Sequence, residues 1–327
     1  MSNFCIRTFP RIHISLIGMN ESNIRRHGGI GFSISSPALM INAYEAKDFQ
    51  IVDNRKINLE KKEYARLIQS LEQLYNEKRF EKKISITIEG DLIPHLGFGS
   101  ETSLRLASLE VLTLINNHLI DKDELIKFSG RGGVSGIGIN TYFDGGFVFD
   151  AGVKEWINEF KPSNLLENRK SLPLLVQRLN VEEWEIGLFV DSRIPSLSEE
   201  SESNFFKKSC PISDYDAYEI LYHCIYGSLS AILEKDKRAF TDSINRIQKT
   251  KWKALERRLY DNLIEKNEIS LFNAGASAVG MSSLGPMLYF FSNSPIDQVI
   301  NNAIALGING KFFKGSMNNS GRIIQYE

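Results

Sequence analysis

Residues 94–103 read PHLGFGSETS, a glycine turn followed directly by hydroxyl side chains. The segment before it, ISITIEG at 84–90, alternates apolar and polar residues as a β-strand does. The segment after it, 100–117, carries apolar side chains at helical spacing. This order places the first N–H groups of a helix, with the hydroxyls of Ser100 and Thr102, where they can bind an anion such as phosphate. A glycine turn that is capped by Ser100 and binds nothing is the alternative.

Glycine is concentrated in further short segments on both sides of this turn. It is costly inside regular elements, but it lets a backbone turn tightly or approach a ligand closely. Several such turns in one chain predict a site built largely from backbone N–H groups, and the usual ligand of such sites is phosphate. The segments are GGIG at 28–31, GRGGVSGIG at 130–138, GGFVFDAG at 145–152 and NAGASAVGMSSLGP at 273–286.

Arginine and histidine side chains accompany these segments. Arg131 lies inside GRGGVSGIG, and its fork of donors matches a phosphate or a carboxylate. In RIHISLI (11–17) apolar and polar residues alternate as in a strand, so Arg11 and His13 share one face and can face a cleft together. Arg26, just before the GGIG turn, is a further candidate. A flexible loop around Arg131 and solvated side chains elsewhere are the alternatives.

Two carboxylates flank the glycine pair in FDGGFVFD. Mg²⁺ is usually held by one or two carboxylates together with phosphate oxygens, so Asp144 and Asp150 form a candidate Mg²⁺ site. Aspartates also stabilise turns by binding nearby backbone N–H groups, and that local role is the alternative.

Length, charge and cysteine content exclude several classes of protein. The chain has 327 residues, enough for two domains and a large core. Lys and Arg number 39 and Asp and Glu 40, a formal net charge of −1, so neither nucleic acid nor an anionic membrane is an expected partner. No signal sequence or membrane-spanning run is recognisable. The spacing of Cys5, Cys210 and Cys224 predicts neither a disulfide framework nor a metal site, and we expect a cytoplasmic protein. A symmetric homodimer is the expected oligomer.

The order of elements predicts an α+β fold in two domains, residues 1–160 and 161–327. The segment 162–182 contains prolines and has little periodicity, so we expect the chain to cross between the domains there. The polar segment 192–213 is expected to form a mobile loop or lid.

Taken together, the glycine segments resemble the GHMP kinase superfamily, and within it they most resemble the β-ribofuranosylaminobenzene 5'-phosphate synthase family. They lie in order over nearly the whole chain, although 155–274 carries less recognisable pattern. The resemblance implies a ribosomal-S5-like first domain and a ferredoxin-like second domain, with the site in the cleft between them. The matching segments are RIHISLIGMN (11–20), GGIGF (28–32), HLGFGSETSLRLA (95–107), GRGGVSGIGINTYFDGGFVFDAG (130–152) and GASAVGMSSLGP (275–286).

The resemblance also implies a reaction. The family condenses 5-phosphoribosyl 1-pyrophosphate with an aromatic carboxylate, forms a C-glycosidic bond and releases pyrophosphate and CO₂. 4-Aminobenzoate, 4-hydroxybenzoate and a heteroaromatic analogue all stay open as the acceptor, as do methanopterin and C-nucleoside biosynthesis as the pathway. Kinases of the superfamily that use a catalytic base carry an acid after a Ser-Gly pair, where this chain has Ile137. An ATP-dependent small-molecule kinase is therefore the second interpretation, and a non-catalytic sensor of a phosphate ligand the third.

The candidate residues receive roles from the same resemblance. Arg131, Asp144 and His13 are expected to carry catalysis, and Asp144 and Asp150 to hold Mg²⁺. Glu101 departs from the small or basic residue expected at its position and receives no role. Pyrophosphate binding is assigned to Gly97, Gly99, Ser100 and Thr102, binding of the 5'-phosphate or pyrophosphate to Arg131, Gly132, Gly133 and Ser135, and binding of the remaining anion or the aromatic carboxylate to Arg11, His13 and Arg26.

Overall fold

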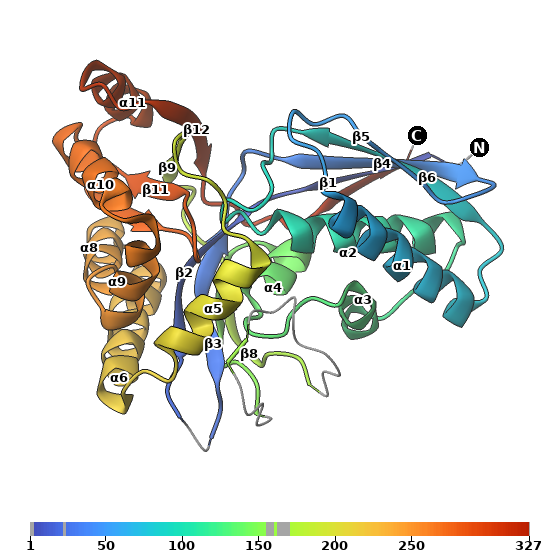
Figure 1. The fold of residues 1–327 in the computed structure, drawn as a ribbon, viewed down its shortest axis with the longest axis horizontal. Coiled ribbons are helices and arrows are strands. Elements are labelled where there is room, and N and C mark those ends of the chain that lie inside the picture. Colours follow the sequence, from blue (N-terminus) through green and yellow to red (C-terminus); the bar gives the residue numbers. More distant parts are fainter. Residues whose placement is uncertain (1–2, 22–23, 155–159, 162–170, 327) are drawn as a thin grey trace.

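Three β-sheets form the framework of the protein, and helices pack against them (Figure 1). The computed structural model describes residues 3–21, 24–154, 160–161 and 171–326. The mixture of mainly antiparallel sheets and helices confirms the predicted α+β class. None of the helices in the described part of the chain is both long enough and apolar enough to cross a membrane.

The first sheet has five strands in the order β13-β1-β4-β6-β5, antiparallel except for the β5–β6 pair. Helix α2 packs against β1 and β4, and α1 packs against α2. Because β13 pairs with β1, the last strand of the chain completes the sheet begun by the first, and the two termini lie close together in Figure 1. The elements are β1 (Asn3–Thr8), β4 (Leu39–Ala46), β5 (Gln50–Asp53), β6 (Lys83–Gly90), β13 (Ile323–Tyr326), α1 (Lys61–Lys78) and α2 (Ser100–Ile115).

The second sheet is antiparallel, with the order β2-β3-β7-β8. Helix α4 packs against β3 and β7, and the short helix α3 packs against α2. The Asp121 carboxylate caps α3 by accepting the N–H groups of Asp123 and Glu124. The elements are β2 (Arg11–Gly18), β3 (His27–Ser33), β7 (Phe147–Asp150), β8 (Leu175–Leu179), α3 (Lys122–Ser129) and α4 (Ile137–Asp144).

The third sheet is also antiparallel, in the order β10-β11-β9-β12, and helices α8, α10 and α11 pack against it on the left of Figure 1. In the described part of the chain, η2 (His223–Leu229) is a π-helix and η3 (Arg258–Tyr260) is a 3₁₀-helix. The strands are β9 (Glu185–Asp191), β10 (Ala278–Met281), β11 (Leu288–Phe291) and β12 (Gly310–Ser316). The α-helices are α5 (Glu199–Ser209), α6 (Asp214–Tyr222), α7 (Ser230–Glu234), α8 (Lys237–Ile247), α9 (Lys251–Arg257), α10 (Leu263–Asn273) and α11 (Ile296–Ala305).

The hydrophobic core joins the two halves of the sequence. Phe32 of β3 packs edge-on against Phe240 of α8, with 6.1 Å between ring centroids, and against Tyr289 of β11, at 6.3 Å. All three side chains are fully buried. Aromatic pairs of this kind add to the free energy gained by burial alone. The contact therefore fixes the sheet of β2 and β3 against the second half of the chain.

The strand predicted at 11–17 is confirmed as β2, and its polar side chains are not solvated, with His13 only 5% and Ser15 only 1% exposed. Helices α6, α8 and α9 from the second half of the chain contact β2. The prediction for residues 192–213 was wrong in part. Residues 192–213 do not form a loop throughout, because they contain α5, which Ser198 caps and whose Phe206 packs against Trp252.

The predicted division of the chain at residues 160 and 161 stays a prediction. The first part of the predicted crossing segment, residues 162–170, lies outside the described residues. Within the described part, β8 from the second half pairs with β7 from the first.

Candidate active site

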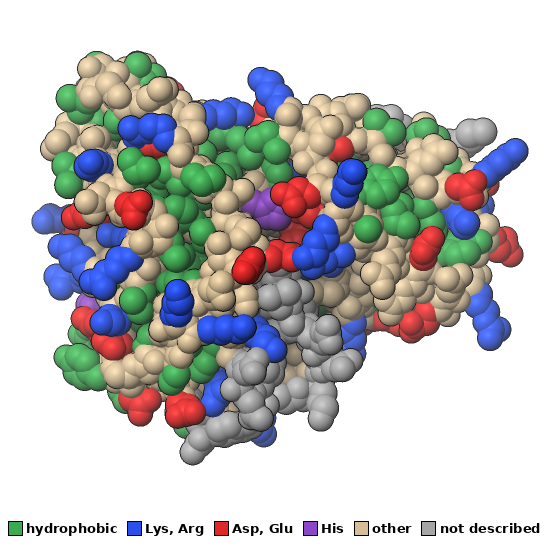
Figure 2. Space-filling model, viewed as in Figure 1, with side chains coloured by type: hydrophobic (Ala, Val, Ile, Leu, Met, Phe, Trp, Pro, Cys, Tyr) green, Lys and Arg blue, Asp and Glu red, His purple; other side chains and the backbone are tan. Residues whose placement is uncertain are grey.

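A cavity of about 160 Å³ lies where β2, the start of α2, the loop before α4 and helix α5 meet. Figure 2 shows the hollow near the centre of the molecule, with histidine and acidic side chains gathered around it. Arg11 and His13 both line the cavity, as their alternation along β2 predicted.

The glycine turn at 97–99 holds the side chain of Arg11. The Arg11 guanidinium donates a hydrogen bond to the carbonyl oxygen of Gly97. Gly99 has φ 75°, and a Cβ there would lie 3.0 Å from both Cγ and Nε of Arg11. Burial, followed by the nearby charge of Arg131, lowers the pKa of Arg11 to about 10. The turn thus keeps a desolvated cation at the start of α2, where an anion would relieve its repulsion with Arg131.

Arg131 lies across the first turn of α2. Its Nε donates to the Oγ1 of Thr102 at 3.1 Å, and its Nη1 pairs with Glu101 at 3.1 Å. The other oxygen of Glu101 pairs with Arg105 at 2.9 Å. Burial opposes the ionisation of Glu101, but Arg131 and Arg105 outweigh it and hold the pKa of that carboxyl below its usual value. Glu101, which received no role from the sequence, therefore positions Arg131. The i,i+4 spacing predicts only the ion pair between Glu101 and Arg105; the contact with Arg131 depends on the tertiary fold.

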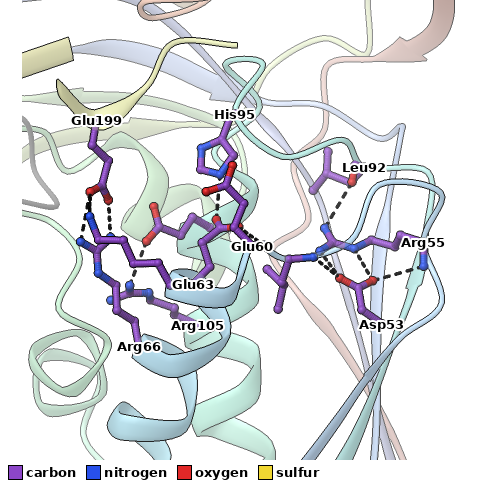
Figure 3. Close-up of polar contacts among 12 residues, drawn as sticks. Asp53, Arg55, Glu60, Glu63, Arg66, Leu92, His95, Arg105 and Glu199 are labelled. Carbon is purple, nitrogen blue, oxygen red and sulfur yellow. Dashed lines mark hydrogen bonds and ion pairs between the residues drawn. The ribbon is translucent and has the colours of Figure 1, made fainter. Parts of the chain in front are cut away.

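Helix α5 covers the cavity and is tied to α1. Glu199 pairs with Lys62 and Arg66, as the close-up in Figure 3 shows for Arg66. The hydrogen bond from Arg66 is the main reason that the pKa of Glu199 falls to about 2. Glu202, one turn further along, also lines the cavity, and burial raises the pKa of its carboxyl to about 7. These contacts join the second half of the chain to the first above the cavity.

His95 adds a titratable cation to the rim of the cavity. Its Nε2 lies 2.8 Å from Oε1 of Glu63 (Figure 3), and this hydrogen bond raises the pKa of His95 above 6.5. A histidine whose folded pKa is raised stabilises the fold below its unfolded pKa, and this contribution is lost as the pH rises through the folded pKa.

We expect the Glu63→Gln variant to titrate His95 at a lower pH than the wild-type chain. Glutamine keeps the capping bond that Glu63 makes to the backbone N–H of Glu60 but removes the negative charge. Titration of the His95 ring signals by NMR measures the change directly. The same titration midpoint in both proteins would show that Glu63 does not set this pKa.

His13, Ser135 and Asp150 form a hydrogen-bonded series that leads inward from the cavity. His13 Nε2 lies 3.2 Å from Ser135 Oγ, which lies 2.9 Å from Asp150 Oδ2. Burial, then the charges of Arg11 and Lys253, hold the pKa of His13 well below 6.5, so its imidazole is neutral. Burial also raises the pKa of Asp150 to about 7, against its hydrogen bonds, which favour the carboxylate.

The second half of the chain supplies one wall of the cavity. Leu197, Phe206 and Leu284 give this wall an apolar surface, and Ser283 and Glu256 add polar groups. The Glu256 carboxylate is buried and paired with Lys253, which also donates to the carbonyl oxygen of Met281 at 2.8 Å. Sequence reasoning missed both residues of this pair, because they lie in the weakly patterned part of the chain. Glu199 and Glu202 also belong to this wall, so its three apolar side chains form a limited surface on which an aromatic ring could lie.

Several predicted site residues lie outside the cavity lining. The Arg26 guanidinium lies over the Phe160 ring, 5.1 Å from its centroid. Gly97 and Gly99 lie behind Arg11, as described above. Of the predicted set, the lining contains Arg11, His13, Thr102, Arg131, Gly132 and Ser135; it does not contain Arg26, Gly97, Gly99, Ser100, Gly133, Asp144 or Asp150.

Asp144 and Asp150 are not placed to share a Mg²⁺ ion with a ligand in the cavity. The Asp144 carboxylate pairs with Lys122 at 2.6 Å and is half-exposed. Asp150 is fully buried and accepts hydrogen bonds from Ser135, Gly136 and Gly152. Among the described residues, no group of three or more His, Cys, Asp or Glu side chains could hold a metal ion. The two aspartates therefore do not fit the metal role that the sequence suggested.

We expect Asp144→Asn to leave the rate and the donor KM within about twofold of the wild-type values, because this carboxylate faces solvent and Lys122 rather than the cavity. Steady-state kinetics over a range of donor concentrations checks this. A tenfold or larger loss would restore Asp144 to the site.

Proteins with similar sequences identify the family of this chain. No family model matches the chain. The chain is 31% identical over 288 residues to the beta-ribofuranosylphenol 5'-phosphate synthase of Methanothermobacter thermautotrophicus, covering 87% of each chain. It is also 31% identical over 291 residues to the protein of that name from Archaeoglobus fulgidus, covering 88% of each chain. The chain belongs to the beta-ribofuranosylphenol 5'-phosphate synthase family. It is therefore a glycosyltransferase that forms a C-glycoside.

Solved structures establish the fold of this synthase family member. Homoserine kinase from Cytophaga hutchinsonii superposes with a TM-score of 0.70 at 13% identity, covering 99% of this chain and 97% of the kinase. L. major mevalonate kinase superposes with a TM-score of 0.68 at 12% identity, covering 96% of each chain. The GHMP-kinase-like fold predicted from the glycine segments is confirmed.

Proposed function

We propose that this synthase condenses 5-phosphoribosyl 1-pyrophosphate with 4-hydroxybenzoate, forming a C-glycosidic bond and releasing pyrophosphate and CO₂. The observation that carries the proposal is the pair of partly buried cations, Arg11 and Arg131, in one cavity with the apolar side chains of Leu197, Phe206 and Leu284. The phenol in the name of the relatives favours 4-hydroxybenzoate over 4-aminobenzoate or a heteroaromatic acid.

The donor end of the reaction needs charge neutralisation. As the bond from the anomeric carbon to pyrophosphate breaks, negative charge accumulates on the leaving group. Arg11 and Arg131 offer donors to that charge, and Thr102 adds a hydroxyl beside Arg131. These groups are held by Gly97 and Glu101 before any ligand arrives, so they need little rearrangement during the reaction.

The acceptor end needs an apolar surface that places one ring carbon against the sugar. Leu197, Phe206 and Leu284 provide such a surface on the opposite wall. The ring carbon that carries the carboxylate attacks the anomeric carbon, and loss of CO₂ restores aromaticity. The reaction needs no nucleophile from the protein. Magnesium stays an expectation from the resemblance, and no step is assigned to it, because Asp144 and Asp150 do not fit its site.

The proposal is tested with 4-hydroxybenzoate labelled with ¹³C in its carboxyl group. The purified chain is incubated with this acid and the phosphoribosyl donor, and NMR follows the label and the product. We expect ¹³CO₂ and a product with a carbon–carbon bond between ring and ribose. Turnover of ATP to ADP with a small-molecule alcohol, and no release of label, would favour a kinase instead. Thermal stabilisation by the donor without any turnover would favour a sensor.

A further inference from the structure

The long helix formed by α6, η2 and α7 has one face that is apolar and exposed. Its opposite face is buried, where α6 packs against β2 and η2 packs against α8. We call the exposed apolar side chains the tyrosine stripe, and they are Tyr215 (78% exposed), Tyr218 (62%), Leu221 (39%), Tyr222 (59%), Tyr226 (73%) and Leu233 (62%). The stripe therefore leaves four aromatic rings in contact with solvent on a single helix.

The spacing of the tyrosines places them side by side along the helix. Tyr215, Tyr218 and Tyr222 are three and four residues apart, the spacing of neighbours on the surface of an α-helix. Tyr226 follows four residues later in the π-helix, and its ring stacks on Tyr222 with 5.1 Å between ring centroids and 22° between ring planes. At Gly227 the helix approaches α8 so closely that a Cβ there would lie 2.7 Å from Cβ of Ser243. Small residues thus face inward and the rings face outward.

The stripe lacks the charged side chains that keep an exposed helix in water. Residues 220–233, ILYHCIYGSLSAIL, contain no Asp, Glu, Lys or Arg. The adjacent helix α8, by contrast, exposes Arg238, Asp242 and Arg246. The centres of protein–protein interfaces are rich in tyrosine and poor in charge, and contiguous apolar patches on a protein surface mark such interfaces. The composition of the stripe is therefore that of a surface that a protein covers.

The size of the stripe fits one half of a symmetric interface. A tyrosine side chain buries about 150–250 Å² in a contact, so the exposed parts of these six side chains amount to roughly 500–800 Å² per chain. Stable interfaces bury about 600–1,000 Å² on each partner. A two-fold axis that crosses the stripe near Tyr222 and Tyr226 lays the helices of two copies antiparallel, so that each stripe covers the other.

A membrane fits the stripe less well than a second copy of the chain does. Helices that lie on anionic membranes carry Lys and Arg beside their apolar face. The stripe begins instead among three carboxylates, those of Asp214, Asp216 and Glu219. Negative charge at this end of the helix opposes binding to a negatively charged lipid surface.

We propose that the tyrosine stripe is the surface through which two copies of this chain form a homodimer. None of its six residues lines the cavity, so each copy keeps its own candidate active site. The proposal does not depend on the reaction proposed above, and it can be tested without a substrate.

The double variant Tyr222→Glu with Tyr226→Glu tests the proposal. It places two carboxylates at the centre of the stripe, where they meet the two of the second copy, and repulsion between like charges opposes association. Sedimentation velocity of the full chain should give the mass of two chains for the wild type and of one chain for the variant. Tyr44→Glu with Tyr64→Glu adds the same charge at exposed tyrosines of β4 and α1, and this matched control should keep the mass of two chains.

A second variant keeps the test decisive if the glutamates disturb the helix. Tyr222→Ser with Tyr226→Ser removes the two central rings without adding charge, and we expect the dissociation constant of the dimer to rise at least tenfold. A monomeric wild-type chain would overturn the proposal, as would a glutamate variant that is folded and keeps the mass of two chains. A monomeric wild type that binds vesicles of phosphatidylcholine and phosphatidylserine, with binding lost in the glutamate variant, would assign the stripe to a membrane instead.

Discussion

Replacing Arg131 by alanine is expected to raise the donor KM about 10- to 100-fold while the protein stays folded. A hydrogen bond to a charged group contributes about 1.5–3 kcal/mol, which corresponds to this range. Arg131 is held in the cavity by Thr102 and Glu101, and its loss leaves Arg11 to bind the anionic donor without its partner. Steady-state kinetics with varied donor at saturating acceptor measures the change.

Arg105→Ala is the matched control for this variant. Arg105 also pairs with Glu101, at 2.9 Å, but it does not line the cavity. We expect its donor KM to change by no more than about threefold, because it removes an ion pair without removing a ligand contact. An equal rise in donor KM for both variants would mean that Arg131 acts only through its ion pair with Glu101. An unchanged donor KM for Arg131→Ala would show that Arg131 does not bind the donor.

Gly152→Ala is expected to cause the largest loss of stability among single substitutions near the site. A Cβ at this position would lie 1.9 Å from the carbonyl oxygen of Arg26 and 2.6 Å from the backbone nitrogen of Gly28. Its φ of 61° also costs an L-residue about 1–2 kcal/mol. Overpacking adds about 1–3 kcal/mol, so we expect the thermal midpoint to fall by about 5 °C or more.

Gly307→Ala separates backbone strain from crowding. Gly307 has φ 81°, but nothing lies within 4 Å of the position its Cβ would take. Gly307→Ala should therefore be destabilised only by the cost of placing an L-residue in the left-handed conformation, about 1 kcal/mol. Similar thermal midpoints for the two variants would show that the chain relaxes around the added methyl group.

Local patterns were enough to predict the elements that carry the site. Alternation along 11–17 placed Arg11 and His13 on one face of β2, and both line the cavity. The apolar repeat after the glycine turn predicted α2, which begins at Ser100. These features depend on short-range periodicity and on the conformational freedom of glycine, which a sequence displays directly.

The distribution of roles within the site could not be predicted in the same way. Gly97 and Gly99 contact the side chain of Arg11, a residue more than eighty positions away in sequence. The ion pair between Glu199 and Arg66 joins α5 to α1, two helices that only the tertiary fold brings together. The burial that raises the pKa of Asp150 likewise comes from packing between distant segments. A motif therefore indicated where the site is, but not which of its residues face the ligand.

A crystal structure of the chain with the phosphoribosyl donor and a non-reactive acceptor analogue would show directly how the cavity binds its ligands. We expect the diphosphate to lie within about 3 Å of both the Arg11 and Arg131 guanidinium groups and of the Thr102 hydroxyl. We also expect the aromatic ring to lie against Phe206 and Leu284. A diphosphate bound elsewhere, or held by the start of α2 with neither arginine in contact, would contradict this arrangement.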